Sequence, residues 1–173
     1  MPQAQTLHYE IIRHRLDNGV EVVVNPDPSS PAVAVNLWYH VGSADEVAGR
    51  SGFAHLFEHL MFQGSSQVPS GEHLSALQAV GGSVNATTSF DRTNYFETLP
   101  AGAAELALWM EADRLTTLDV SQANLDNQRE VVKEEKRQRY DNVPYGDQLD
   151  LLLALNFPSD HPYGHTTIGS MDD

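Results

Sequence analysis

The sequence predicts an α+β fold, with a mixed, mainly antiparallel sheet and helices packed on one side of it. Three apolar, β-branched segments come first, two more follow a helical stretch, and most of the remaining chain has helical periodicity. No linker, repeat or low-complexity tract divides the 173 residues. A single globular domain is therefore expected.

The first two strands flank Asp17-Asn18-Gly19, which is typical of a hairpin turn because Asn and Gly tolerate positive φ angles. Ser121 is a candidate amino-terminal cap for a long helix. We expect strands at residues 7–16, 20–24, 32–42, 83–90 and 92–100, and helices at 52–65, 71–82, 101–118 and 121–140.

Charge and composition exclude several classes of partner. The formal net charge is −14, from 24 acidic and 10 basic residues, so phosphate backbones and anionic membrane surfaces are repelled. The same field would attract a basic peptide, although many acidic proteins are acidic only for solubility. We expect no nucleic acid and no membrane among the partners.

The amino terminus has neither a basic nor an apolar signal region, and no stretch approaches the roughly eighteen apolar residues that cross a bilayer. A cytoplasmic protein is expected, unless a signal peptide has been removed. Because the chain has no cysteine, its strong metal ligands are His, Asp and Glu.

The segment at 52–65 is apolar but carries three ionisable residues, His55, Glu58 and His59. On a helix these side chains fall within a wedge about 100° wide, and apolar side chains occupy most of the remaining surface. A single buried histidine is usually bonded to backbone or carboxylate. Two histidines at positions i and i+4 instead place two imidazoles on one face, where they can bind one Zn²⁺ at about 2.0 to 2.1 Å.

In this pattern Glu58 faces the open position of the metal, where it can take a proton from a water molecule. Catalytic zinc usually has three protein ligands, so a third ligand must come from elsewhere. The predicted helix at 121–140 offers Glu130, Glu134 and Glu135. On a helical wheel only Glu135 falls on the apolar face, and the other two acids fall outside it.

Gln128 lies on the same face as Glu135 and is suited to a hydrogen bond with one of the ligands, or it lies merely at a helix interface. The remaining histidines are weaker candidates. His161 and His165 are four residues apart, but Pro162 and Gly164 predict a loop there. We expect structural or solvated roles for His8, His14, His40 and His73.

The H-x-x-E-H order of His55, Glu58 and His59 resembles that of the inverzincins, the pitrilysin or insulinase-like family of zinc metallopeptidases, which includes processing peptidases. The resemblance extends to "SGFAHLFEHLMFQGS", "GGSVNATTSFDRTNYF" and "VVKEE", with Glu135 76 residues after His59. It runs from about residue 8 to residue 170 and includes the first hairpin.

The resemblance implies a hydrolase, a zinc endopeptidase that cuts peptides or unstructured protein segments. His55, His59 and Glu135 would hold one Zn²⁺ per domain, and Glu58 would be the general base. Family members bind substrate by adding the peptide to an edge strand. The matching stretch, "SVNAT", would place Asn85 and Ala86 beside the scissile bond, although the segment alone also fits an interior strand.

Two departures from the family pattern matter. Several relatives have a glutamate seven positions before the third ligand, where this chain has Gln128.

Relatives are also built from two halves that enclose the substrate, each half containing two similar domains. Residues 1–173 would then form most of one amino-terminal zinc-binding domain, truncated at its carboxyl-terminal end. The second half would lie on the same polypeptide or on a homologous subunit, and a homo- or hetero-oligomer is compatible with the pattern.

Two other classes of function remain open. Noncatalytic scaffold or interaction subunits of the same fold exist, but these typically lack the zinc motif, which is intact here. A purely structural zinc site normally has four protein ligands and no positioned glutamate.

Overall fold

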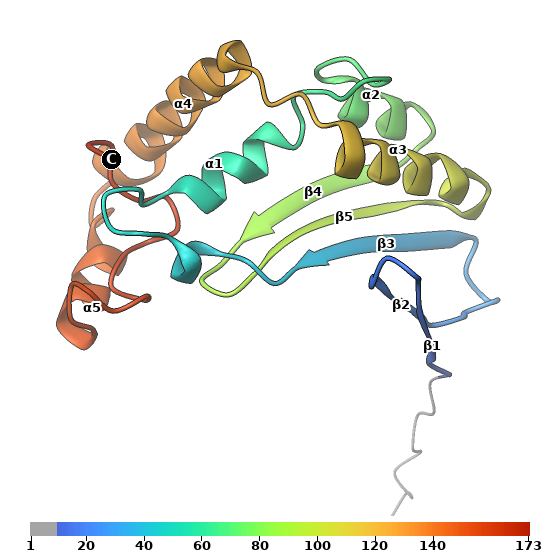
Figure 1. The fold of residues 1–173 in the computed structure, drawn as a ribbon, viewed down its shortest axis with the longest axis horizontal. Coiled ribbons are helices and arrows are strands. Elements are labelled where there is room, and N and C mark those ends of the chain that lie inside the picture. Colours follow the sequence, from blue (N-terminus) through green and yellow to red (C-terminus); the bar gives the residue numbers. More distant parts are fainter. Residues whose placement is uncertain (1–9) are drawn as a thin grey trace, which may run out of the picture. The chain divides into compact units, whose positions relative to one another are not determined.

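The computed structural model describes residues 10–173, and its contacts divide the chain into two compact units that meet at residues 31 and 32 (Figure 1). In the first unit, β1 (Ile12–Arg15) pairs antiparallel with β2 (Glu21–Val24). Gly19 has φ +92°, so the expected hairpin turn is present and its glycine adopts the left-handed conformation. The strand expected from residue 7 begins at Ile12, and His8 lies outside the described residues.

The second unit contains a three-stranded antiparallel sheet in the order β3-β5-β4. Its strands are β3 (Ala32–Tyr39), β4 (Ser83–Thr88) and β5 (Thr93–Pro100). The central strand β5 is the most buried because it has a partner on each side, whereas β4 lies at one edge. In this register Asn85 is opposite Phe96 and Ala86 is opposite Tyr95.

Three helices pack over one face of this sheet in Figure 1: α1 (Phe53–Leu60), α2 (Glu72–Ala79) and α3 (Ala104–Thr117). The chain continues through α4 (Gln122–Lys136), a π-helical turn (Arg137–Asp141) and α5 (Gln148–Asn156). The hydrophobic core between sheet and helices consists of Val68, Leu77, Leu99, Ala107 and Met110. The α+β class with helices on one side of an antiparallel sheet is thereby confirmed.

Some expectations about individual elements were wrong. A single sheet was expected to hold all five strands, but β1 and β2 form a separate two-stranded sheet. The connection at 25–31 contains Pro26, Pro28 and Pro31, which have no N–H to donate to a sheet ladder. The helix at 148–156 was not predicted, because its leucines surround the helix instead of forming one stripe.

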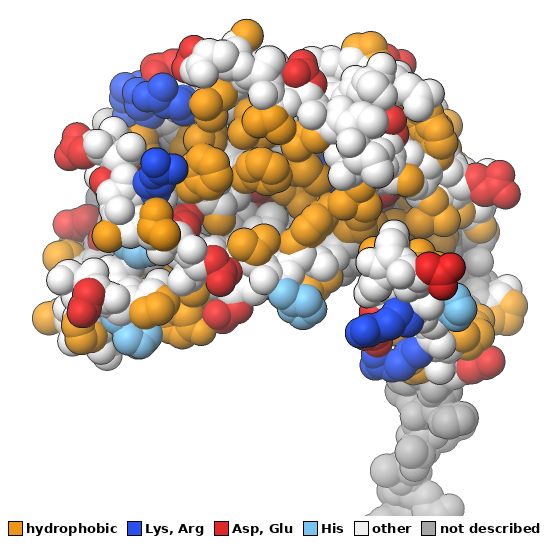
Figure 2. Space-filling model, viewed as in Figure 1, with side chains coloured by type: hydrophobic (Ala, Val, Ile, Leu, Met, Phe, Trp, Pro, Cys, Tyr) orange, Lys and Arg blue, Asp and Glu red, His pale blue; other side chains and the backbone are white. Residues whose placement is uncertain are grey.

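The helix expected at 52–65 is shorter than predicted, and part of its apolar surface is exposed. It ends at Leu60, and Gly64, with φ +107°, is outside the conformation that a helix extending to residue 65 would need. Phe53 and Phe57 are exposed on the described chain. With Tyr39, Tyr95 and neighbouring residues they line an apolar hollow of about 440 Å³ between α1 and the sheet, and Figure 2 shows hydrophobic side chains gathered on this face.

A buried ionic cluster lies between α2, α3 and the central strand β5. His73 Nε2 is 3.3 Å from Glu97 Oε1 and 3.4 Å from Glu111 Oε1. Arg114 Nε donates to Glu111 Oε2 at 2.9 Å, and the Arg114 guanidinium lies over the Tyr95 ring at 4.5 Å. Two carboxylates are thus balanced by two cations when His73 is protonated, which is how charges are tolerated in an interior.

The cluster shifts the protonation of His73. Burial alone would lower the pKa of this imidazole, but its hydrogen bonds to Glu111 and Glu97 outweigh burial and raise the pKa above its ordinary value. In Glu111, burial is outweighed by the hydrogen bonds from its neighbours and by the charge of Arg114, so the pKa is lowered. His73 therefore has a structural role, which agrees with the expectation from sequence.

This arrangement predicts how stability depends on pH. A histidine whose pKa is raised by folding stabilises the folded state. This stabilisation is complete at pH values below the unfolded pKa of about 6.5, and it is lost as the pH rises through the folded pKa. We expect the free energy of unfolding, measured with urea in the presence of a chelator, to decrease from pH 6 to pH 8 more in the native chain than in His73→Gln. His73→Gln should also be less stable at pH 6 by roughly 1–3 kcal/mol, since it leaves buried carboxylates poorly paired.

The matched control is His40→Gln, because His40 is exposed. It should retain the native pH dependence. If His73→Gln and the native chain lost the same stability between the two pH values, the raised pKa would be contradicted.

Candidate metal centre

The helix α1 presents His55 and His59 to Glu135 of α4, and Glu58 to Thr88 of β4. Gly52 precedes the helix with φ +84°, and the helix proper begins at Phe53. One turn separates the two histidines, so their rings lie close together, with centroids 4.8 Å apart in an edge-to-face arrangement. The i, i+4 spacing thus produces the neighbouring imidazoles that the sequence predicted.

Glu135, near the carboxyl end of α4, reaches these two rings. Its Oε2 atom lies 3.3 Å from His59 Nε2 and 3.7 Å from His55 Nε2. The three candidate ligand atoms all lie within 4.8 Å of one another. Residues more than seventy positions apart in the sequence therefore come together at one point.

The three acids of α4 differ sharply in exposure. The Glu135 side chain is 16% exposed, whereas that of Glu134 is 53% exposed and that of Glu130 is 68% exposed. The acid that the helical wheel placed on the apolar face is the one that the fold partly buries. Glu130 and Glu134 instead form surface ion pairs with Lys133 and Arg137.

The donor set and its spacing fit a zinc ion. Ligand atoms at 2.0 to 2.2 Å from a tetrahedral centre are about 3.3 to 3.5 Å apart, which is close to the separations of Glu135 Oε2 from the two imidazoles. Two nitrogens and one carboxylate oxygen are also the donors typical of catalytic zinc, which leaves a fourth position open. The second oxygen of Glu135 is engaged by Arg139 Nη1 at 2.6 Å, which directs Oε2 toward the histidines.

The electrostatics of the site follow from its burial. Burial, and then the neighbouring His59, lower the pKa of His55, which favours the neutral imidazole that binds metals. Burial also raises the pKa of Glu58, against the opposing hydrogen bond from Thr88. A carboxyl with a raised pKa has more affinity for a proton than an exposed glutamate has.

Thr88 was missed by reasoning from sequence. It is the last residue of β4, and its hydroxyl donates a hydrogen bond to Glu58 Oε2. No local pattern distinguishes Thr88 from Thr87 beside it. The contact arises only because β4 lies next to α1, as Figure 1 shows.

The other predicted residues lie on α4, on β4 and in the carboxyl-terminal loop. Gln128 is buried on α4, but within the described part of the chain it makes no hydrogen bond to His55, His59 or Glu135. Asn85 is exposed and Ala86 is half-buried on the edge strand β4. His161 and His165 lie in a loop, as expected.

A second group of potential ligands, His73, Glu97 and Glu111, is the buried cluster described above. There Arg114 already binds Glu111, so a cation is present in place of a metal.

In residues 10–173, no helix has both the length and the apolar character needed to span a membrane.

Known proteins are similar to this chain in sequence and in fold. "Zinc protease PqqE" of Helicobacter pylori (strain ATCC 700392 / 26695) is 36% identical over 163 residues, which cover 91% of this chain and 36% of that protein. The crystal structure of a protease from Helicobacter pylori has a TM-score of 0.85 and 35% identity, and the match covers 95% of this chain and 39% of that one.

Pitrilysin has a TM-score of 0.81 at 24% identity, over 99% of this chain and 18% of the pitrilysin chain, which supports the fold alone. The chain thus spans about a third of the length of the curated relatives that it matches. The model of "Insulinase (Peptidase family M16)" matches residues 21–168. On this evidence, the chain belongs to the insulinase family of peptidases, family M16.

Proposed function

We propose that this chain is the zinc-binding, amino-terminal part of a metalloendopeptidase. The observation that carries the proposal is the convergence of His55 Nε2, His59 Nε2 and Glu135 Oε2, with Glu58 between the histidines on the same helix. The zinc proteases among the relatives support the same assignment. A noncatalytic scaffold has no need of a glutamate that is positioned next to three potential ligands.

Bound by these three side chains, zinc would supply Lewis-acid chemistry by lowering the pKa of water and polarising a peptide carbonyl. The protein contributes the base. Thr88 holds one oxygen of Glu58, so the carboxylate is fixed in orientation. The other oxygen is then available to take a proton from the attacking water and to pass it to the leaving amine.

Substrate would bind at β4. Within the described sheet this strand pairs only with β5, so its other edge can accept an extended peptide. Asn85 and Ala86 lie on β4 upstream of Thr88, and we assign them to contacts with the peptide backbone. Backbone hydrogen bonds hold a peptide extended and depend little on its side chains. The net charge of −14 favours basic peptides.

The rest of the catalytic assembly would come from a second half, on the same polypeptide or on a homologous subunit. The relatives are about three times as long as this chain, which supports that division. A second half would cover the peptide on its other side and exclude water. This chain would then be an amino-terminal domain that supplies one zinc site and one strand for substrate.

Glu58→Gln in the full-length protein should abolish most peptide hydrolysis and leave zinc bound. The amide keeps the size of the side chain but cannot take a proton, and loss of a general base typically costs 10²- to 10⁴-fold in rate. Zinc content and kcat for an unstructured peptide are the two measurements. Glu72→Gln, on an exposed helix position, is the control, and retention of most activity by Glu58→Gln would refute the role of base.

Two substitutions on α4 should distinguish a metal ligand from a surface acid. These are Glu135→Gln and Glu134→Gln. Loss of the carboxylate at Glu135 should weaken zinc binding by about 100-fold or more, because even partners outside the ligand set contribute 10- to 100-fold. Glu134→Gln should bind zinc as the native protein does. Competition with a chromophoric chelator measures both affinities, and equal losses in the two variants would contradict the assignment.

The isolated 173-residue chain should bind zinc yet cleave peptides slowly. A peptide held only along one strand is ordered by few contacts, and the scissile carbonyl must be held about 3 Å from the attacking water. The zinc-loaded chain and the full-length protein are compared on an unstructured basic peptide. Equal zinc-dependent turnover by both would show that the second half is dispensable.

A further inference from the structure

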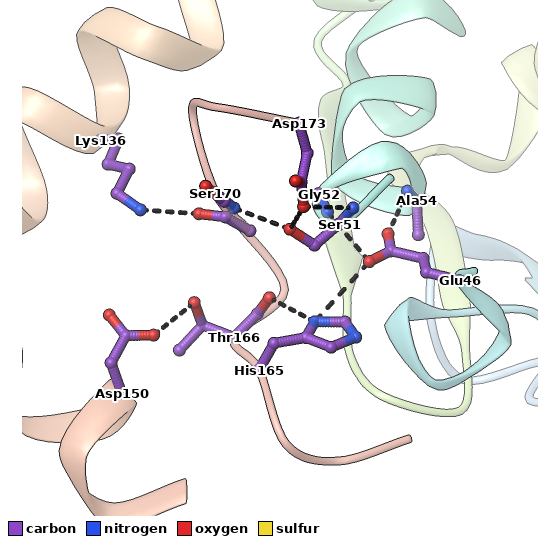
Figure 3. Close-up of polar contacts among 11 residues, drawn as sticks. Glu46, Ser51, Gly52, Ala54, Lys136, Asp150, His165, Thr166, Ser170 and Asp173 are labelled. Carbon is purple, nitrogen blue, oxygen red and sulfur yellow. Dashed lines mark hydrogen bonds and ion pairs between the residues drawn. The ribbon is translucent and has the colours of Figure 1, made fainter. Parts of the chain in front are cut away.

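A loop at residues 166–170, here called the 166–170 loop, contacts both helices that carry the proposed zinc ligands (Figure 3). On one side, the Ser170 amide donates to Oγ of Ser51, two residues before α1 begins, at 2.8 Å. On the other side, Lys136 Nζ donates to the Gly169 carbonyl oxygen at 2.6 Å. Lys136 is the last residue of α4 and directly follows Glu135.

The contact with α1 is made by backbone against backbone. A Cβ atom on Gly169 would come within 2.3 Å of Gly52 N, and a Cβ atom on Gly52 would come within 2.5 Å of the Ile168 carbonyl oxygen. Both glycines have positive φ, +69° and +84°. Only glycine allows this approach, and Gly52 is three residues before His55.

The loop is held firmly by its other contacts. Thr166 Oγ1 donates to Asp150 Oδ1 on α5 at 2.8 Å. Ile168 is buried and lines a hollow together with Leu56 of α1 and Val132 of α4. The loop therefore has little freedom to follow a movement of either helix.

Glu46 adds a second attachment at the same end of α1. Its Oε1 accepts from the Ala54 amide at 2.7 Å and its Oε2 accepts from the Gly52 amide at 2.9 Å, which satisfies donors that a helix start leaves free. His165 Nδ1, directly before the 166–170 loop, lies 3.7 Å from Glu46 Oε2. Figure 3 shows these contacts meeting around the start of α1.

We infer that the 166–170 loop is a positioning element for the metal centre, which holds α1 and α4 at the separation at which His55, His59 and Glu135 reach one ion. The inference rests on the proposed zinc function. Zinc–ligand distances are held within about 0.2 Å, so a shift of one helix against the other weakens binding even when every ligand is present. The residues assigned here are Gly52, Lys136 and Gly169, none of which would contact the ion.

The first test is Gly169→Ala in the full-length protein, with Gly49→Ala as its matched control. Gly49 also has positive φ, +78°, but a Cβ atom there would meet nothing within 4 Å. The two variants therefore carry similar backbone strain, and only Gly169→Ala must push Gly52 away. We expect about tenfold or greater loss of zinc affinity in Gly169→Ala by chelator competition, and native affinity in Gly49→Ala.

The second test avoids a steric change, in case Gly169→Ala fails to fold. Lys136→Met removes the hydrogen bond to the loop, and Lys133→Met removes a surface ion pair one turn earlier on α4. We expect Lys136→Met to bind zinc severalfold more weakly than Lys133→Met, and Lys136→Arg to restore the affinity. The visible absorption of bound Co²⁺ should change in Lys136→Met, because it reports ligand geometry, which a loss of stability alone does not alter.

The outcomes separate the two proposals. If the native protein binds zinc and both Gly169→Ala and Lys136→Met keep native affinity and a native Co²⁺ spectrum, the positioning role is wrong and the zinc site stands. Equal losses in the variants and in their matched controls would also overturn the positioning role. If the native protein itself binds no zinc, the proposed function fails, and this inference fails with it.

Discussion

The approach of Glu135 to two imidazoles on a neighbouring helix is the constraint on which the rest of this structure depends. Oε2 of Glu135 lies 3.3 Å from one imidazole nitrogen and 3.7 Å from the other, although α1 and α4 are separated by two strands and two helices in the sequence. Such a distance is sensitive to small displacements of either helix. Several other features of the unit serve to keep the two helices in place.

Two groups of polar contacts, one partly buried and one buried, support the elements around this constraint. On one side, Glu46 and the 166–170 loop hold the start of α1, and Lys136 joins the same loop to α4. On the other side, Arg114 lies between Glu111 and the ring of Tyr95, within the core that supports the sheet. In both places carboxylates are paired with cations or amides, since unpaired burial would cost several kcal/mol per charge.

Local patterns predicted much of the fold and the composition of the candidate site. The hairpin turn, the Ser121 cap, which accepts from the Asn124 amide at 3.3 Å, and the strand β3 all follow from short-range rules. Helical periodicity alone also separated Glu135 from Glu134. These features depend on residues within about one turn or one strand, so a single sequence contains them.

Contacts between distant segments could not be predicted in the same way. The exposure of Phe53 and Phe57, the bond from Thr88 to Glu58 and the meeting of Gly52 with Gly169 depend on which elements lie side by side. Hydrophobic periodicity predicts that a helix has an apolar face, but it does not predict how much of that face is covered by another element. The division of the five strands into two sheets also depends on contacts between distant segments, so the sequence did not predict it.

The donor atoms of the candidate centre have a consequence for its chemistry with oxidants. The three proposed ligands are two imidazoles and one carboxylate, and the chain contains no cysteine. Zinc sites built from thiolates release their metal when oxidants convert the sulfur to sulfenic acid or disulfide. A nitrogen and oxygen donor set has no such group, so peroxide or disulfide stress would leave these ligands chemically unchanged.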